Sequence, residues 1–265
     1  MTWAPRGLRA APCHPLARML TDYHVHLRPD GDDTPPSGYF TAALDVWAHP
    51  WWRRWATDDL EAYVGFVREE TDLRLGFEAD FVAGREDRLA SLLEGYEWDY
   101  VVGSVQFLGD YSVDVDDETD VWRHETSPER VWKRYFETLA ESALTGLYDI
   151  IAHPDLAKIW GSARPLPDAD PRRYYEPAIE AMLDANVAME VSTAGLRKPV
   201  GEIYPARAML EMAVDAGVPI ALSSDAHVPE HIGYGYDQAR ELLEACGVKE
   251  LAVFERRVRR MEPLG

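Results

Sequence analysis

The chain has 265 residues, a length that suits a single α/β domain. Its 47 acidic residues outnumber its 27 basic residues, and the formal net charge of −20 argues against non-specific binding to nucleic acid and against attraction to an anionic membrane surface. No apolar run approaches the roughly 20 residues that span a bilayer, and two cysteines are too few for a disulfide framework, which favours a reducing cytoplasm.

The first 18 residues differ in composition from the rest of the chain. They carry three arginines and no acidic residue, and three prolines interrupt any apolar or amphipathic helix. We therefore expect residues 1–18 to form a disordered extension without an export signal, and residues 19–265 to form one domain.

Within residues 19–265, apolar β-rich runs alternate with longer amphipathic stretches, a pattern typical of repeated βα units and a mainly parallel sheet. We expect strands at 20–26, 73–81, 100–107, 148–152, 187–192, 218–223 and 251–254. We expect helices at 58–71, 85–94, 128–144, 174–185, 204–216 and 236–246. Ser127 and Pro128 supply an N-cap and a first-turn proline for the longest helix, and Gly217 is a good C-cap.

Histidines and acids gather at the predicted carboxyl ends of these strands. His24 and His26 close the first strand, and Asp225 and His227 follow the strand at 218–223. Residues i and i+2 of a strand project from the same face, so each pair can point into one cavity. Imidazoles and carboxylates are side chains that suit a divalent transition metal.

Two further strands contribute similar residues. Glu78 lies inside an apolar strand, where an acid is costly unless it is ion-paired, hydrogen-bonded or bound to a cation, and Asp80 could share its face. His153 follows the strand at 148–152. Each residue alone could be an ordinary core or salt-bridged side chain, but parallel α/β folds place their active sites at this edge of the sheet. The candidate metal ligands are His24, His26, Glu78, His153, Asp225 and His227.

Six sequence blocks after Met19 resemble the PHP (polymerase and histidinol phosphatase) superfamily, and specifically its histidinol-phosphate phosphatase branch. The similarity covers nearly the whole chain after that residue. The blocks are Asp22-Tyr-His-Val-His26, Gly76-Phe-Glu-Ala-Asp80, Asp99-Tyr-Val-Val-Gly-Ser-Val105, Ala152-His-Pro-Asp155, Ser192-Thr-Ala-Gly-Leu-Arg-Lys-Pro199 and Ser224-Asp-Ala-His227.

This resemblance implies a distorted (β/α)7 barrel of the TIM type, with up to three divalent ions (Zn, Mn or Fe) that activate water for attack on a phosphate monoester. Glu78 would bridge two ions. His24, His26 and Asp225 would complete the shell of the first ion, His153 would bind the second and His227 the third. Glu78, Asp225 and His227 would then be the catalytic residues.

Phosphate also needs a cationic partner. Arg197, just beyond the strand at 187–192, could offer its guanidinium group, and Lys158 is a second candidate. Asp155 could orient His153 or hold the substrate amine. The alternative for Arg197 is a surface arginine on an ordinary loop.

The chain departs from the family pattern at two places. Gln106 stands where relatives usually have a histidine, and a neutral amide is a poor ligand for zinc-like metals, so fewer than three ions could bind. We also find no counterpart of a helix, a strand and a Thr/Ser-Glu/Asp-His motif that precede the region near Ala43, so the barrel is expected to lack one βα unit near its N-terminus. His49 is expected to be a loop histidine. The tryptophans at 47–55 could pack in the core or cover the barrel mouth, or they could form an apolar wall around a substrate ring.

The leading hypothesis is a cytoplasmic phosphomonoesterase of histidine biosynthesis that converts L-histidinol phosphate to L-histidinol and phosphate. Its partner would be a small phosphate ester, with no nucleic acid or membrane, and the chain could form a homo-oligomer. A catalytically impaired barrel that binds metal or a partner protein is a second hypothesis. A metal-dependent amidohydrolase, which also starts from His-x-His on a barrel strand, is a third.

Overall fold

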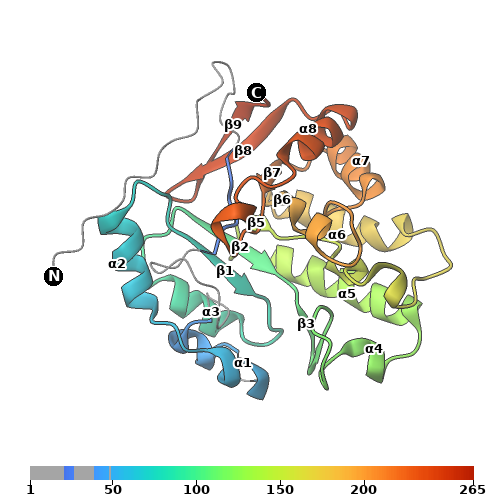
Figure 1. Ribbon diagram of the computed structural model, residues 1–265, viewed down its shortest axis with the longest axis horizontal. Helices are drawn as coiled ribbons and strands as arrows, with labels where there is room; N and C mark the ends of the chain where they lie inside the picture. The colour runs from blue at the N-terminus through green and yellow to red at the C-terminus, as the bar shows by residue number, and fades with distance from the viewer. Residues whose placement is uncertain (1–20, 27–38, 48) are drawn as a thin grey trace.

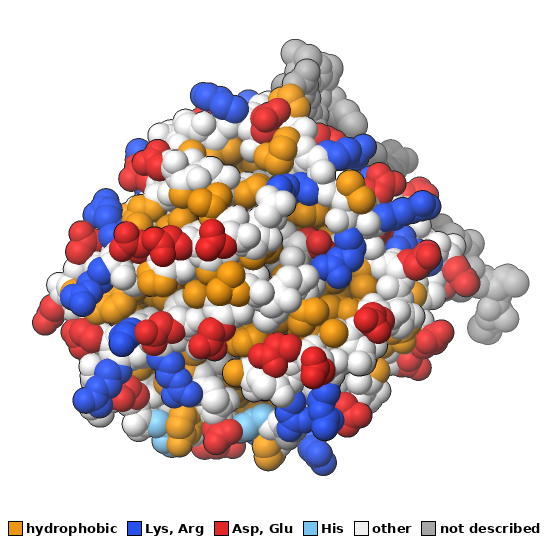
Figure 2. Space-filling model, turned by 180° about the vertical axis from the view of Figure 1, so that it is seen from behind, with side chains coloured by type: hydrophobic (Ala, Val, Ile, Leu, Met, Phe, Trp, Pro, Cys, Tyr) orange, Lys and Arg blue, Asp and Glu red, His pale blue; other side chains and the backbone are white. Residues whose placement is uncertain are grey.

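The structure is a computed structural model that describes residues 21–26, 39–47 and 49–265 (Figure 1). The expected extension at residues 1–18 lies outside these residues. No helix in the described part of the chain combines the length and the apolar character that crossing a bilayer requires. On the face shown in Figure 2, Lys and Arg side chains are scattered among Asp and Glu side chains.

Five parallel strands form the central sheet in the order β1-β2-β5-β6-β7. Their bounds are Gly76–Asp80, Tyr100–Ser104, Ile150–Ile151, Ala188–Ser192 and Ile220–Ser223. Beside β7, the segment 22–26 adds a parallel bridge between Val25 and Ala226, supported by a 2.8 Å hydrogen bond from His26 N to Ala226 O. Because all these strands run in the same direction, their carboxyl ends meet at one edge of the sheet.

The expected barrel is present only as this open α/β sheet. Within the described residues, β1 pairs with β2 and with no strand on its other side. Of the expected first strand at 20–26, the described residues 21–26 form only the Val25 bridge. The expected strand at 251–254 does not join the parallel sheet. It forms β8 (Glu250–Glu255), which pairs in an antiparallel hairpin with β9 (Val258–Pro263), a strand that the sequence analysis missed.

Helices flank the sheet on two sides. In Figure 1, α2 (Leu60–Glu70) and α3 (Glu86–Leu93) lie near β1, whereas α5 (Pro128–Leu144), α6 (Arg172–Asp184), α7 (Arg207–Ala216) and α8 (Tyr236–Ala245) follow one another along the other flank. Ser127 caps α5 by accepting a hydrogen bond from Arg130 N, as the sequence predicts. Helix α7 begins three residues later than expected, because the residue before Pro205 is disfavoured in helical conformation. Two short helices, α1 (Pro50–Trp55) and α4 (Val121–His124), and a hairpin of β3 (Phe107–Leu108) and β4 (Tyr111–Ser112) complete these elements.

The two faces of the sheet have different partners. One face packs against the helices through residues such as Val101, Met189 and Leu222. The other, here called the inner face, carries apolar side chains that cluster with Tyr23 and with β8; its buried members include Val102, Ile150, Ala188 and Ala221.

Polar residues occupy the carboxyl end of this inner face. Glu78 is paired with Val102 in the strand register, and Glu190 with Ala221, so both acids lie on the inner face. Asp80 and Ser104 form a further pair one step along. The fold therefore aims acidic side chains inward at the edge where the predicted ligands were expected.

Candidate metal centre

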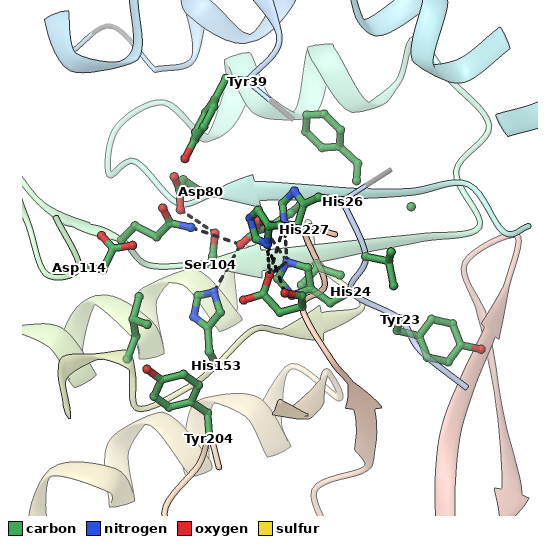
Figure 3. Close-up of a pocket in the computed structure, with 18 of the residues that line it drawn as sticks. Tyr23, His24, His26, Tyr39, Asp80, Ser104, Asp114, His153, Tyr204 and His227 are labelled. Atoms are coloured by element: carbon green, nitrogen blue, oxygen red, sulfur yellow. Dashed lines mark hydrogen bonds and ion pairs between the residues drawn. The ribbon is translucent and has the colours of Figure 1, made fainter. Parts of the chain in front are cut away.

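All six predicted ligands converge at the carboxyl edge of the sheet. His24 and His26 come from the first segment, Glu78 from β1, His153 from the loop after β5, and Asp225 and His227 from the loop after β7. Figure 3 shows His24, His26, His153 and His227 turned toward one another around a common space. Residues more than two hundred positions apart in the sequence thus form one cluster.

The tightest part of the cluster has the spacing of metal ligands. His24 Nε2 lies 3.2 Å from His26 Nε2 and 3.2 Å from Glu78 Oε2, and His26 Nε2 lies 3.4 Å from the same oxygen. Two atoms that each lie about 2.1 Å from a tetrahedral ion are about 3.4 Å apart. This nearly equilateral triangle therefore has the dimensions of one face of a coordination tetrahedron.

A second group shares His26 with the first. His26, Asp225 and His227 place ligand atoms within 4.8 Å of one another. Asp225 Oδ1 lies 3.4 Å from His26 Nε2 and 3.5 Å from His227 Nδ1, and the two imidazole rings stack with their centroids 4.0 Å apart. Two neighbouring positions for cations are thus outlined by the described residues.

His153 sits at the margin of the cluster. Its Nε2 atom is 3.4 Å from Glu78 Oε1, and its Nδ1 atom is buried with no hydrogen-bond partner in the described part of the chain. Gln106 Nε2 donates to the same Glu78 oxygen at 3.4 Å. The side of Glu78 that faces His153 therefore has an amide where another imidazole would complete a third group.

Mutual electrostatics dominate the protonation of these side chains. Burial alone would lower the pKa of His24, but the carboxylates of Glu78, Asp225 and Glu190 outweigh it and raise this pKa well above 6.5. Burial likewise opposes the charge on His26, whose pKa nevertheless rises to about 9 through Asp225 and Glu78. Burial would raise the pKa of Glu78, yet the surrounding histidines hold it well below 4.5. The carboxylates thus favour positive charge at this centre, and the nitrogen and oxygen donors fit a divalent transition metal.

Glu190 is a buried acid beside the candidate ligands that the sequence analysis missed. It is 1% exposed, and its Oε1 atom accepts hydrogen bonds from His24 Nδ1 at 3.0 Å and from Ser223 Oγ at 2.6 Å. The signal was available, because Glu190 is an acid inside the apolar strand Ala188–Ser192, as Glu78 is inside its own strand. Asp22 has a comparable role, since its carboxylate accepts hydrogen bonds from Ser224 N and Gly233 N and so fixes the loop that carries Asp225.

A cavity of about 230 Å³ opens beside the cluster. Its lining includes all six candidate ligands, Gln106 and Trp52, and the polar residues Asp80, Asp114, Lys198 and Tyr204. Trp47 also lines it, so part of the tryptophan-rich segment forms a cavity wall. His49 is not among the lining residues; its side chain caps α1 by accepting a hydrogen bond from Trp51 N.

The two cations expected to bind phosphate are engaged elsewhere. Arg197 donates from Nη2 to the carbonyl oxygens of Ser224 and Asp225, at 2.7 and 2.9 Å. The Lys158 ammonium is buried, 2.9 Å from Ile203 O and 3.1 Å from Asp155 Oδ2. Neither residue is among those that line the cavity, whereas Lys198 is.

A parallel α/β sheet whose carboxyl edge gathers histidines and carboxylates around a cavity defines a metal-dependent hydrolase. No protein-family model matches the chain. A Deinococcus radiodurans protein named "Probable histidinol-phosphatase" is 32% identical over an alignment of 267 positions, which covers 92% of this chain and 99% of the relative. The histidinol-phosphatase of Bacillus subtilis is 28% identical over 84% of this chain and 85% of its own length. The chain therefore belongs to the histidinol-phosphatase family, as the sequence blocks predicted.

A solved structure shares the fold. It is the histidinol phosphate phosphatase of Lactococcus lactis, complexed with zinc, L-histidinol and phosphate. It matches with a TM-score of 0.67 at 18% identity and covers 90% of this chain and 98% of the solved chain.

Proposed function

We propose that this chain is a metal-dependent phosphomonoesterase that hydrolyses L-histidinol phosphate to L-histidinol and phosphate. The observation that carries the proposal is the convergence of six ligand side chains beside a cavity, in a chain 32% identical to a histidinol-phosphatase relative. The Lactococcus lactis neighbour, complexed with zinc, L-histidinol and phosphate, supports the same substrate.

We assign the ligand roles from the two groups described above. His24, His26 and Glu78 would hold one divalent ion, and Asp225 and His227, with His26 between them, would hold a second. When bound, Zn, Mn or Fe would supply Lewis acidity toward a phosphate oxygen and a nucleophile at neutral pH. His153 faces Glu78 beside Gln106, so we expect a third ion to bind weakly or not at all.

The remaining cavity residues suit the other groups of the substrate. Lys198 is the cation that we assign to the phosphate, because it lines the cavity, whereas Arg197 and Lys158 do not and donate to backbone carbonyls. Asp80 and Asp114 could accept hydrogen bonds from the substrate's ammonium group. Arg197 instead holds the backbone of Asp225 in place.

We further infer that the open parallel sheet belongs to a distorted (β/α)7 barrel that lacks one βα unit between the first segment and β1. The parallel bridge at Val25 and the single pairing of β1 among the described residues support this arrangement. The likeness to the Lactococcus lactis fold supports it as well.

Substrate preference tests the proposal. We expect zinc- or manganese-loaded protein to show a higher kcat/KM for L-histidinol phosphate than for p-nitrophenyl phosphate, which lacks the ammonium and imidazole groups. Hydrolysis of a cyclic amide such as dihydroorotate, with no phosphate released from L-histidinol phosphate, would indicate an amidohydrolase. Release of neither product by folded, metal-loaded protein would indicate a catalytically impaired barrel.

A further inference from the structure

One buried carboxylate connects three of the segments that carry the proposed metal ligands. Glu190 projects from β6 on the inner face of the sheet and is 1% exposed. Its Oε1 atom contacts His24 Nδ1 at 3.0 Å and Ser223 Oγ at 2.6 Å, and its Oε2 atom accepts a hydrogen bond from His153 N at 2.6 Å. These contacts reach the first segment, the end of β7 and the loop after β5.

The contact with His24 fixes the orientation of its ring. A carboxylate accepts hydrogen bonds, so Nδ1 of His24 carries the proton and Nε2 is left to face Glu78 and Asp225. Metal-bound histidines usually donate their second ring N–H to such a carboxylate or carbonyl, which sets the tautomer and the ring direction. His24 is the only ion-pair partner of Glu190 among the residues that the structure describes.

The contact with His153 fixes a strained backbone. His153 has φ = 25°, a conformation that is costly for a residue with a β-carbon. Its N–H group points to Glu190 Oε2, and its carbonyl oxygen lies 3.4 Å from the Tyr135 hydroxyl. Glu190 thereby holds the turn that directs the His153 ring toward Glu78.

We propose that Glu190 is the positioning residue of the metal centre, acting through His24, His153 and Ser223 on the affinity for divalent ions. This inference rests on the metal site of the proposed function, but it concerns the binding of the ion and not the chemistry that follows. Glu190 is not among the residues that line the cavity, so it has no assigned contact with substrate.

Glutamine at this position tests the role without a large change in volume. Glu190→Gln has one acceptor oxygen, whereas the carboxylate accepts on both sides. In one orientation of the amide, its oxygen faces His24 and Ser223 and its NH₂ group faces the N–H of His153. In the other orientation, the NH₂ group faces the donors of His24 and Ser223. Either orientation removes at least one of the three supports.

A matched control separates positioning from general stability. Asp99 is another buried acid, 4% exposed, and it accepts hydrogen bonds from Leu75 N and Arg256 N at the amino-terminal edge of the sheet, away from the metal centre. Asp99→Asn should lower the melting temperature while leaving the metal affinity unchanged, because none of its partners holds a candidate ligand.

The experiment compares the dissociation constants of Zn²⁺ and Mn²⁺ for metal-free wild type, Glu190→Gln and Asp99→Asn, measured by chelator competition without substrate. We expect Glu190→Gln to bind about 10- to 100-fold more weakly, the usual effect of removing such a partner of a metal-bound histidine, and Asp99→Asn to match the wild type. Wild-type affinity in folded Glu190→Gln, or an equal loss in both variants, would overturn the inference. A wild type whose affinity depends on Glu190 but that releases no phosphate from L-histidinol phosphate would support the inference and refute the proposed function.

Discussion

Asp99 gives a prediction whose magnitude follows directly from the contacts of one side chain. Its Oδ2 atom accepts hydrogen bonds from Leu75 N and Arg68 Nη1, both at 2.8 Å, and its Oδ1 atom accepts one from Arg256 N at 3.1 Å. These contacts tie β2 to the segment before β1 and to the turn between β8 and β9.

Asp99→Asn leaves only one acceptor oxygen for donors on two sides. One backbone N–H, that of buried Leu75 or that of Arg256, then loses its charged acceptor, which costs about 1 to 3 kcal/mol, and the partly exposed ion pair with Arg68 is worth about 0.2 to 1 kcal/mol. We expect the variant to lose about 1 to 4 kcal/mol of unfolding free energy at pH 7. Urea denaturation of metal-free protein, followed by circular dichroism, measures this loss, and Asp72→Asn on the exposed surface is the control.

The contacts of Asp99 also predict that the unfolding free energy depends on pH. Burial would raise the pKa of Asp99, but the two backbone donors and Arg68 outweigh it, so its pKa lies below 3.8 in the folded protein. A lowered folded pKa means that the stabilisation is present above about pH 3.8 and is lost as the pH falls through the folded value. The difference in unfolding free energy between wild type and Asp99→Asn should therefore become smaller under acid. A difference below about 0.5 kcal/mol at pH 7, or one that widens on acidification, would refute this reasoning.

Three further changes have expected outcomes. Gln106→His places an imidazole beside Glu78 and His153 and should raise the number of zinc or manganese ions bound per chain, measured by elemental analysis after dialysis. An unchanged metal content would contradict the assignment of a third ligand group to Glu78, His153 and position 106. Lys198→Ala should raise KM for L-histidinol phosphate about tenfold, equivalent to about 1.4 kcal/mol, with metal content unchanged, while exposed Lys249→Ala should have no effect. Gly103→Ala should destabilise the protein by about 1 to 3 kcal/mol, because its β-carbon would lie 2.4 Å from the Tyr148 ring. Gly65→Ala in α2 meets no atom within 4 Å and should stabilise the protein by about 0.5 to 1 kcal/mol. Thermal or urea unfolding that ranked the two variants in the opposite order would contradict the packing described.

Local patterns predicted most of the helices and the parallel strands, because each of them depends on nearby residues. The Ser127-Pro128 cap and the apolar spacing after it set both ends of α5 correctly. The hairpin of β8 and β9 was missed for a physical reason: β9 is largely exposed and rich in arginine, so it lacks the apolar alternation that marks a half-buried strand. Closure of the barrel depends on contacts between distant strands, which no local pattern specifies.

In the candidate site, too, local patterns predicted some features and missed those that depend on contacts between distant segments. The six candidate ligands were selected by residue type and strand position, and the structure brings their side chains together. The backbone contacts of Arg197 and Lys158 could not be read from the sequence, because any residue provides the carbonyl oxygens involved, which are those of Ser224, Asp225 and Ile203. Lys198 was overlooked because only the fold shows that Lys198, and not the adjoining Arg197, lines the cavity.

The most direct test of the central claim is phosphate release from L-histidinol phosphate during titration of metal-free protein with Zn²⁺ or Mn²⁺. We expect activity to appear as ions bind, to disappear on addition of a chelator and to be absent in Glu78→Ala, since Glu78 contacts three histidines of the cluster. The exposed Glu69→Ala should behave as the wild type. Phosphate release that is independent of metal, or that persists in folded Glu78→Ala, would contradict the account.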